Sequence, residues 1–280
     1  KLNQLKALEP SNTAVDKKLA EIYYLKNDFS KAAEAYANFA MGPTATEEDL
    51  VKYAFALFLN HDFEKSLEVA NMGLQKNAHH AAFNRLAMYN YTDLKRFDEA
   101  IKAADIFFNE CEKADYSYLD YMYYGHLLES LKKYDDAVIQ YEKAVKMDPT
   151  KTDLYKNISS AYEQKNDYKK AISAYQKYYA SLDKEKQTPD LQFQVGRLYY
   201  GAGMQPDSLT ITVEERKQAL MSADSVFHAI AEAAPDSYLG NFWRARANSA
   251  LDPETTQGLA KPFYEEVAAL LESKNDPHYN

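Results

Sequence analysis

One short pattern returns five times along the chain, and its spacing limits the possible folds more than any other feature. The copies read NDFSKA, HDFEKS, KRFDEA, KKYDDA and NDYKKA, each with an aromatic residue in third place. Successive aromatic residues are separated by 34, 34, 37 and 34 residues. A fixed period of this length is typical of an array of stacked supersecondary units. The aromatic residues that mark the period are Phe29, Phe63, Phe97, Tyr134 and Tyr168.

Each unit is predicted to contain two helices. A small residue follows each aromatic residue by three positions, as Ala137 follows Tyr134, and twelve positions earlier stands another residue that is usually small, here Gly125. The apolar residues around these positions recur every three or four residues, which is the spacing of a helix face. Small side chains allow two antiparallel helices to approach closely. Pro149 follows the second helix and cannot continue it, so it separates one unit from the next.

The unit resembles the tetratricopeptide repeat (TPR), a helix–turn–helix of 34 residues with large, small and aromatic residues at fixed offsets. The resemblance implies an all-α fold, a right-handed TPR superhelix (α-α solenoid) of about seven helix pairs plus a partial N-terminal unit. It is carried most clearly by residues 118–151, whose matching positions are Tyr121, Tyr124, Gly125, Leu128, Tyr134, Ala137, Tyr141, Ala144 and Pro149.

On this basis the whole chain, residues 1–280, is expected to form a single TPR solenoid domain. Thr212 and Glu215 have capping-box spacing and should begin the second helix of a repeat that carries a long insertion at about 203–214. The first and last segments look incomplete, so we expect the natural chain to be longer on at least one side. The expected parts are a partial repeat at 1–10, clear repeats at 13–46, 47–80, 81–114, 118–151 and 152–185, the repeat with the insertion at 189–235, and a degenerate repeat at 238–273.

Charge and composition narrow the range of functions. The chain has 33 Lys and Arg against 42 Asp and Glu, a formal net charge of −9, and no basic cluster in its sequence, so nucleic acid is not an expected partner. No apolar run approaches the ~18 residues that a membrane-spanning helix requires, so direct membrane insertion is not expected either. The six histidines are scattered, and no acid lies at a helical metal-ligand offset beside them. We therefore predict no catalytic residues, no metal and no cofactor, and a protein that is not an enzyme.

The resemblance also implies where a partner would bind. In a TPR stack the first helix of each unit lines the concave face, and the positions that packing does not need point into the groove. Here these positions are rich in aromatic residues, and exposed rings bring a large contact area to a partner at low entropy cost. The predicted partner-binding groove consists of Phe55, Phe58, Arg85, Tyr89, Met122, Tyr123, His126, Lys156, Asn157, Ser160, Phe193, Gln194, Arg197 and Tyr200.

The leading hypothesis is a non-enzymatic protein–protein interaction scaffold that binds a segment of a partner protein or peptide in this concave groove. One alternative is a carbohydrate- or small-molecule-binding receptor that stacks its ligand on the groove tyrosines Tyr89, Tyr123 and Tyr200. A pocket capped by the long insertion would favour the receptor, and an open groove would favour the scaffold.

A further alternative rests on the degenerate last units, from about residue 224 to 267. They loosely resemble TPR proteins of the Gram-negative bacterial envelope. This resemblance implies a regulatory or assembly subunit of a bacterial envelope complex, and it favours the periplasm or cell envelope over the cytoplasm. The sequence predicts neither the identity of the partner nor the oligomeric state.

Overall fold

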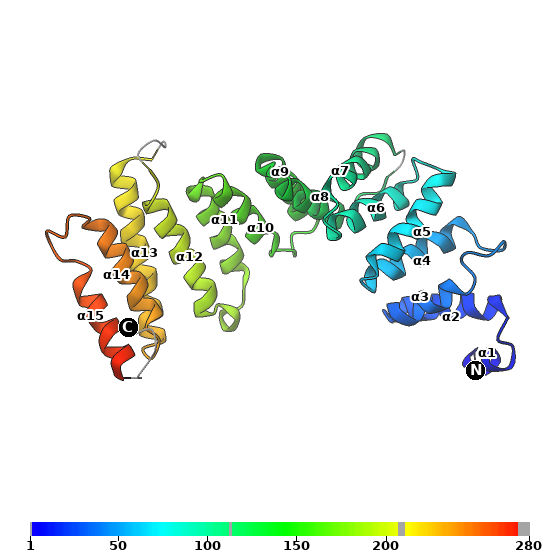
Figure 1. Ribbon diagram of the computed structural model, residues 1–280, viewed down its shortest axis with the longest axis horizontal. Coiled ribbons are helices and arrows are strands. Elements are labelled where there is room, and N and C mark those ends of the chain that lie inside the picture. Colours follow the sequence, from blue (N-terminus) through cyan, green and yellow to red (C-terminus); the bar gives the residue numbers. More distant parts are fainter. Residues whose placement is uncertain (1, 112–113, 207–210, 274–280) are drawn as a thin grey trace. The chain divides into compact units, whose positions relative to one another are not determined.

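The computed structural model describes residues 2–111, 114–206 and 211–273, and over these residues it contains helices and no strand. The predicted all-α fold is therefore confirmed, with fifteen α-helices in the described part of the chain (Figure 1). The chain forms two compact units, of which the first ends at Lys133 and the second begins at Tyr134. Residues 207–210 of the expected insertion and the tail from residue 274 lie outside the described residues.

The first unit is built from consecutive helices that pack as hairpins, α2 with α3, α4 with α5 and α6 with α7 (Figure 1, blue to green). A turn of π-helix, η1, continues α7, and α8 packs on α6 and α7. The elements are α1 (Leu2–Leu8), α2 (Thr13–Leu25), α3 (Phe29–Ala37), α4 (Glu47–Leu59), α5 (Phe63–Lys76), α6 (Ala81–Asp93), α7 (Phe97–Asp105), η1 (Ile106–Glu110) and α8 (Tyr118–Ser130).

The second unit repeats this arrangement, with α10 against α11, α12 against α13 and α14 against α15 (Figure 1, green to red). The hydroxyl of Thr212 and the carboxylate of Glu215 form the predicted capping box, and α13 begins at the next residue after Thr212. The elements are α9 (Tyr134–Met147), α10 (Leu154–Gln164), α11 (Tyr168–Ser181), the 3₁₀ turn η2 (Lys184–Lys186), α12 (Pro189–Gly203), α13 (Val213–Ala233), α14 (Leu239–Leu251) and α15 (Lys261–Ser273).

Small residues lie where the two helices of a hairpin cross. Ala54 on α4 and Ser66 on α5 are both fully buried, and the Ser66 hydroxyl donates a hydrogen bond of 2.8 Å to the carbonyl oxygen of Ala54. Ser159 on α10 makes the same 2.8 Å bond to the carbonyl oxygen of Ala171 on α11. A buried hydroxyl is tolerated here because its hydrogen-bonding capacity is satisfied by the backbone of the partner helix. The crossing can therefore stay close with serine as well as with alanine.

The turn before each of the five aromatic residues that mark the period has a left-handed residue that the sequence pattern did not reveal. Five residues have φ near +60°, each two positions before the aromatic residue that marks the period. At Lys95 the backbone N–H donates to the carbonyl of Thr92 (3.0 Å), and the next N–H, of Arg96, donates to that of Tyr91 (2.8 Å), which is a Schellman motif. Glycine is the usual residue at this position because a side chain costs free energy there. None of the five is glycine: they are Asn27, His61, Lys95, Lys132 and Asn166.

This strain gives a stability prediction. Lys95→Gly should stabilise the protein by ~0.5–1 kcal/mol, because relief of the left-handed strain exceeds the entropy that glycine adds to the unfolded chain. Lys102, a lysine on the exposed face of α7, is the matched control, and Lys102→Gly should destabilise by about 1 kcal/mol as a helix-interior glycine. Thermal melting of the two variants measures both changes. A lower melting temperature for Lys95→Gly would contradict the assignment.

Candidate functional site

Three of the predicted groove aromatics meet on the first helices of unit 1. The rings of Phe58 on α4 and Tyr89 on α6 lie 5.4 Å apart, and Tyr123 on α8 stacks on Tyr89 at 4.1 Å. Tyr89 is only 1% exposed and Phe58 only 9%. The expectation that these two rings face an open groove is therefore wrong. The physical reason is that rings from successive first helices stack on one another between repeats, which covers their faces.

A buried carboxylate explains why Tyr89 points inward. Asp120, on the first turn of α8, is completely buried and accepts a 2.6 Å hydrogen bond from the Tyr89 hydroxyl. It also accepts bonds of 2.7 and 3.1 Å from Nε and Nη2 of Arg85. Burial raises the pKa of Tyr89, and the Asp120 charge raises it further. The Arg85 guanidinium lies 5.1 Å from the ring centre of Phe107. Arg85 thus belongs to an internal ion pair, which corrects its prediction as a groove residue.

The same arrangement occurs two repeats earlier in the array. Asp49 is the third residue of α4, as Asp120 is the third residue of α8, and its carboxylate accepts a 2.7 Å bond from Nζ of Lys17 on α2. Burial raises the pKa of the Asp49 carboxyl, but the hydrogen bonds from Lys17 and Thr46 outweigh it and hold the pKa below its usual value. Sequence analysis missed both pairs. The sequence does contain a signal for these pairs, because each basic residue is followed by an acidic residue about one repeat later.

The acid–base link between repeats predicts a large stability effect. Asp120→Asn should destabilise the protein by ~3 kcal/mol, because it leaves Arg85 part-buried without a countercharge. Asp93→Asn is the control: this exposed carboxylate accepts a 3.0 Å bond from the Tyr123 hydroxyl, and the loss of that bond should cost about 0.5 kcal/mol. Chemical denaturation of both variants measures the difference. Equal losses of unfolding free energy in Asp120→Asn and Asp93→Asn would show that the burial of Asp120 adds nothing to the cost of the substitution.

The other predicted residues of unit 1, Phe55, Met122, Tyr123 and His126, are half-buried. Burial lowers the pKa of His126, although Glu129 and Asp93 act in the opposite direction. Tyr123 has one ring face on Tyr89 and an edge contact with Phe58 at 5.9 Å. Its ring is therefore part of the packing between repeats as well as of the surface.

Two substitutions separate the ring of Tyr123 from its hydroxyl. Tyr123→Ala should destabilise by ~2 kcal/mol, since it removes the contacts with Tyr89 and Phe58. Tyr123→Phe keeps the ring, loses only the bond to Asp93, and should change stability by about 0.5 kcal/mol or less. Melting temperatures of the two variants provide the comparison. A Tyr123→Ala variant as stable as the wild type would place the ring entirely on the surface.

In unit 2, the first helices α10 and α12 hold all the remaining predicted residues. Arg197 forms a two-pronged ion pair with Glu163, with nitrogen–oxygen distances of 2.7 and 2.8 Å, and its Nε donates to Gln194 at 2.9 Å. The hydrogen bonds that Arg197 donates to the Glu163 carboxylate raise the pKa of Arg197. Arg197 thus joins α12 to α10, and Gln194 supports it within α12, while their part in a binding groove stays a prediction.

Lys156 keeps an exposed charge, although it has neighbours. Its Nζ lies 3.1 Å from a carboxylate oxygen of Asp153 and 4.7 Å from the ring centre of Tyr178. Asn157 and Ser160, on the same helix, are half-buried. These three residues therefore form a polar strip on α10, separate from the aromatic residues on α12.

The predicted aromatics of α12 belong to a cluster with α14. Phe193 and Tyr200 make edge contacts with Trp243 at 5.4 and 5.3 Å. The guanidinium carbon of Arg246 lies 4.6 Å from the Trp243 ring centre, 5.3 Å from that of Tyr200 and 6.0 Å from that of Phe242. Arg246 is exposed and the rings are half-buried.

The groove predicted from the sequence includes neither Trp243 nor Arg246. The available signal was the single tryptophan of the chain followed three positions later by arginine. That spacing puts both side chains on one face of a helix.

A hollow of about 620 Å³ lies beside the described ends of the insertion. Gln205, Ile211 and Glu215 contribute to it from the insertion and the start of α13, and none of the three groove tyrosines lines it. The remaining lining residues come from α11, α12 and α13 and the turn before α11: Lys165, Asn166, Asp167, Tyr168, Lys169, Ile172, Tyr199, Ala202, Gln218, Ala219 and Ser222.

Neither a membrane-spanning helix nor a metal-binding cluster occurs in residues 2–111, 114–206 and 211–273. In these segments every helix is too short or too polar to cross a lipid bilayer. No three His, Cys, Asp or Glu side chains of the same segments come together in a way that could hold a metal ion.

Comparison with known proteins places the fold among repeat proteins. Residues 125–186 match the sequence profile of the tetratricopeptide repeat. No curated protein matches the sequence significantly. The C-terminal part of a TPR repeat-containing protein from Cytophaga hutchinsonii is 29% identical, with a TM-score of 0.59 and 80% of each chain covered.

Two other solved structures share the fold at lower identity. A tetratricopeptide repeat protein from Parabacteroides merdae is 18% identical, with a TM-score of 0.53 over 82% of this chain and 87% of that one. MamA from Desulfovibrio magneticus, residues 41 to the end, is 14% identical, with a TM-score of 0.53 over 63% of this chain and 97% of that one. The sequence match assigns residues 125–186 to the tetratricopeptide repeat, and the helix hairpins and the solved structures show that the chain shares the fold of TPR proteins.

Proposed function

We propose that this protein is a non-enzymatic scaffold that binds a segment of a partner protein on its first-helix surface. The TPR fold generally mediates interactions between proteins, and the observation that carries the proposal is the exposed Arg246 stacked on Trp243 and Tyr200. Tryptophan, tyrosine and arginine are the residue types most enriched among those that dominate binding energy. The three define the surface, called the Arg246 surface below.

The electrostatic state of Arg246 distinguishes it from other arginines. Arg85, Arg197 and Arg244 each form an ion pair with an internal carboxylate. Among the described residues, Arg246 has no carboxylate within ion-pair distance and rests on aromatic rings instead. Cation–π contacts hold a guanidinium in place while leaving its N–H groups available. Arg246 is thus positioned in advance to donate hydrogen bonds to a carboxylate or a main-chain carbonyl of a partner.

The ligand that suits this surface is a short protein segment of ~5–15 residues, extended or helical. An acidic or carbonyl group would contact Arg246, and an apolar side chain would lie against the Trp243 and Tyr200 rings. The half-buried residues of unit 1, and Lys156, Asn157 and Ser160 of unit 2, remain secondary candidates for contacts along the same segment.

Arg246→Ala tests the proposal because it removes an exposed side chain. Binding of the partner, identified by affinity capture with the wild-type protein, should weaken by ~1–2 kcal/mol, about fivefold to thirtyfold, while the melting temperature stays nearly unchanged. The control is Arg96→Ala, which removes the same charge from an exposed arginine of unit 1 paired with Glu99. Isothermal titration with the purified partner measures both. Equal affinity of wild type and Arg246→Ala for every captured partner would reject the Arg246 surface.

A small-molecule receptor is the second candidate, and the 620 Å³ hollow beside the insertion is what favours it. Its lining includes the apolar Ile172, Ala202 and Ala219 and the polar Gln205 and Gln218. The version of this hypothesis that stacks a ligand on Tyr89 is not supported, because that ring is buried. Ala219→Trp would fill the hollow, and a ligand whose thermal stabilisation disappears in this variant would support a receptor.

A further inference from the structure

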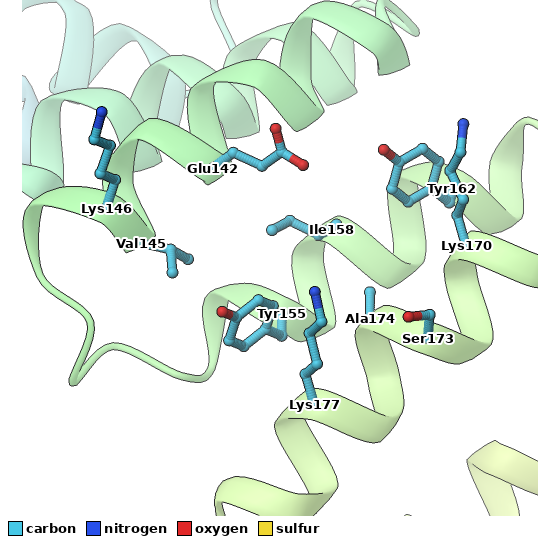
Figure 2. Close-up of a pocket in the computed structure, with 10 residues that line it drawn as sticks. All are labelled: Glu142, Val145, Lys146, Tyr155, Ile158, Tyr162, Lys170, Ser173, Ala174 and Lys177. Atoms are coloured by element: carbon cyan, nitrogen blue, oxygen red, sulfur yellow. The ribbon is translucent and has the colours of Figure 1, made fainter.

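A second hollow of unit 2 shares no residue with the Arg246 surface. It has a volume of about 380 Å³ and lies between α9, α10 and α11. Figure 2 shows side chains of α10 and α11 running beside one another along the hollow, with those of α9 on the other side. The lining residues are Glu142, Val145 and Lys146 from α9, Tyr155, Ile158 and Tyr162 from α10, and Lys170, Ser173, Ala174 and Lys177 from α11.

Two lysine–tyrosine pairs form the ends of this hollow. Nζ of Lys177 lies 5.6 Å from the ring centre of Tyr155, and Nζ of Lys170 lies 5.2 Å from that of Tyr162. Both tyrosines are half-buried and lie on α10, seven residues apart, as the two lysines do on α11. Seven residues are close to two helical turns, so each set lies on one helix face. The ring contacts hold both ammonium groups at the hollow.

The charge of the hollow is opposite to that of the chain. Three lysines line it against the single carboxylate of Glu142, whereas the whole chain has a formal net charge of −9. Lys170 is paired with Asp167 at 3.0 Å. Within the described segments, Lys146 and Lys177 form no ion pair. A hollow with a positive rim, an apolar centre at Ile158 and two tyrosine hydroxyls is suited to carboxylates attached to a peptide.

We propose that this hollow binds an acidic segment of a partner protein, with two carboxylates three residues apart in a polyproline-II backbone. Lys170 and Lys177 are separated by ~10.5 Å along α11. Three residues of a polyproline-II helix complete one turn and span ~9 Å, so both acids lie on one side of the segment and one can face each lysine. The positive charge that would attract the acidic segment is confined to the hollow. The net negative charge of the whole chain repels a long polyanion such as nucleic acid.

The proposal can be tested with a defined peptide and the whole chain. The probe is the end-capped peptide GSETVESG, whose two glutamates are three residues apart, and the control peptide GSQTVQSG replaces them by glutamine. Titration is followed by heteronuclear NMR of the labelled protein. We expect saturable shifts at the amides around Lys170 and Lys177 with the acidic peptide only.

Matched variants assign the binding to the hollow. K170Q/K177Q should weaken the acidic peptide about tenfold. K217Q/K261Q removes the same charge from exposed lysines of this unit and should change affinity by about twofold or less. Glu142→Gln removes the one opposing carboxylate and should tighten binding about threefold. The Arg246→Ala variant should bind the acidic peptide like the wild type, so the two surfaces are tested separately.

Several results would overturn the proposal. Equal binding of the glutamine peptide would make the hollow an apolar site, and equal weakening by both lysine pairs would make the attraction non-specific. No saturable shift at α10 and α11, or unchanged affinity in Glu142→Gln, would place the peptide elsewhere. Tighter binding of a single-stranded oligonucleotide at the same amides would replace the acidic protein segment by nucleic acid.

Discussion

The close approach of two helices at small residues is the contact on which the rest of this protein depends. Where Ala54 and Ser66 cross, no side chain larger than an alanine or a serine separates the two backbones, and the serine hydroxyl is satisfied by a backbone carbonyl. A hairpin of this kind has an apolar face that it cannot bury alone. Stacking of neighbouring hairpins is therefore required, and larger side chains fill the space between the stacked hairpins.

Links between repeats follow from this geometry. The aromatic rings of successive first helices meet, as Phe58, Tyr89 and Tyr123 do, and fill the space between hairpins. Buried acids at helix starts, Asp49 and Asp120, then fix neighbouring first helices through Lys17 and Arg85. Because a buried ion pair is costly if it is incomplete, such links favour one stacking register over others. The groove-facing side of each first helix is consequently partly structural.

The repeat itself could be predicted from the sequence, because a period of 34 residues and small residues at fixed offsets are local patterns. The capping box at Thr212 and Glu215 was likewise readable, since its two residues are three positions apart. The burial of Tyr89 could not be read in this way. It depends on Asp120, 31 residues later, and on how two hairpins stack. The left-handed turn residues were missed because lysine and histidine occupy a position where glycine is the recognisable signal.

The left-handed turn residues also affect how the repeat array unfolds. Five of the turns between helices contain a strained residue at the same place, and the strain is confined to that turn. In repeat proteins each unit contacts chiefly its neighbours, so its stability is set locally. Hairpins with asparagine at the turn, at residues 27 and 166, carry less strain than those with lysine or histidine. The identity of this one turn residue thus sets how readily each hairpin opens. Partial unfolding is therefore expected to begin at particular repeats because of their turn residues rather than because of their core packing.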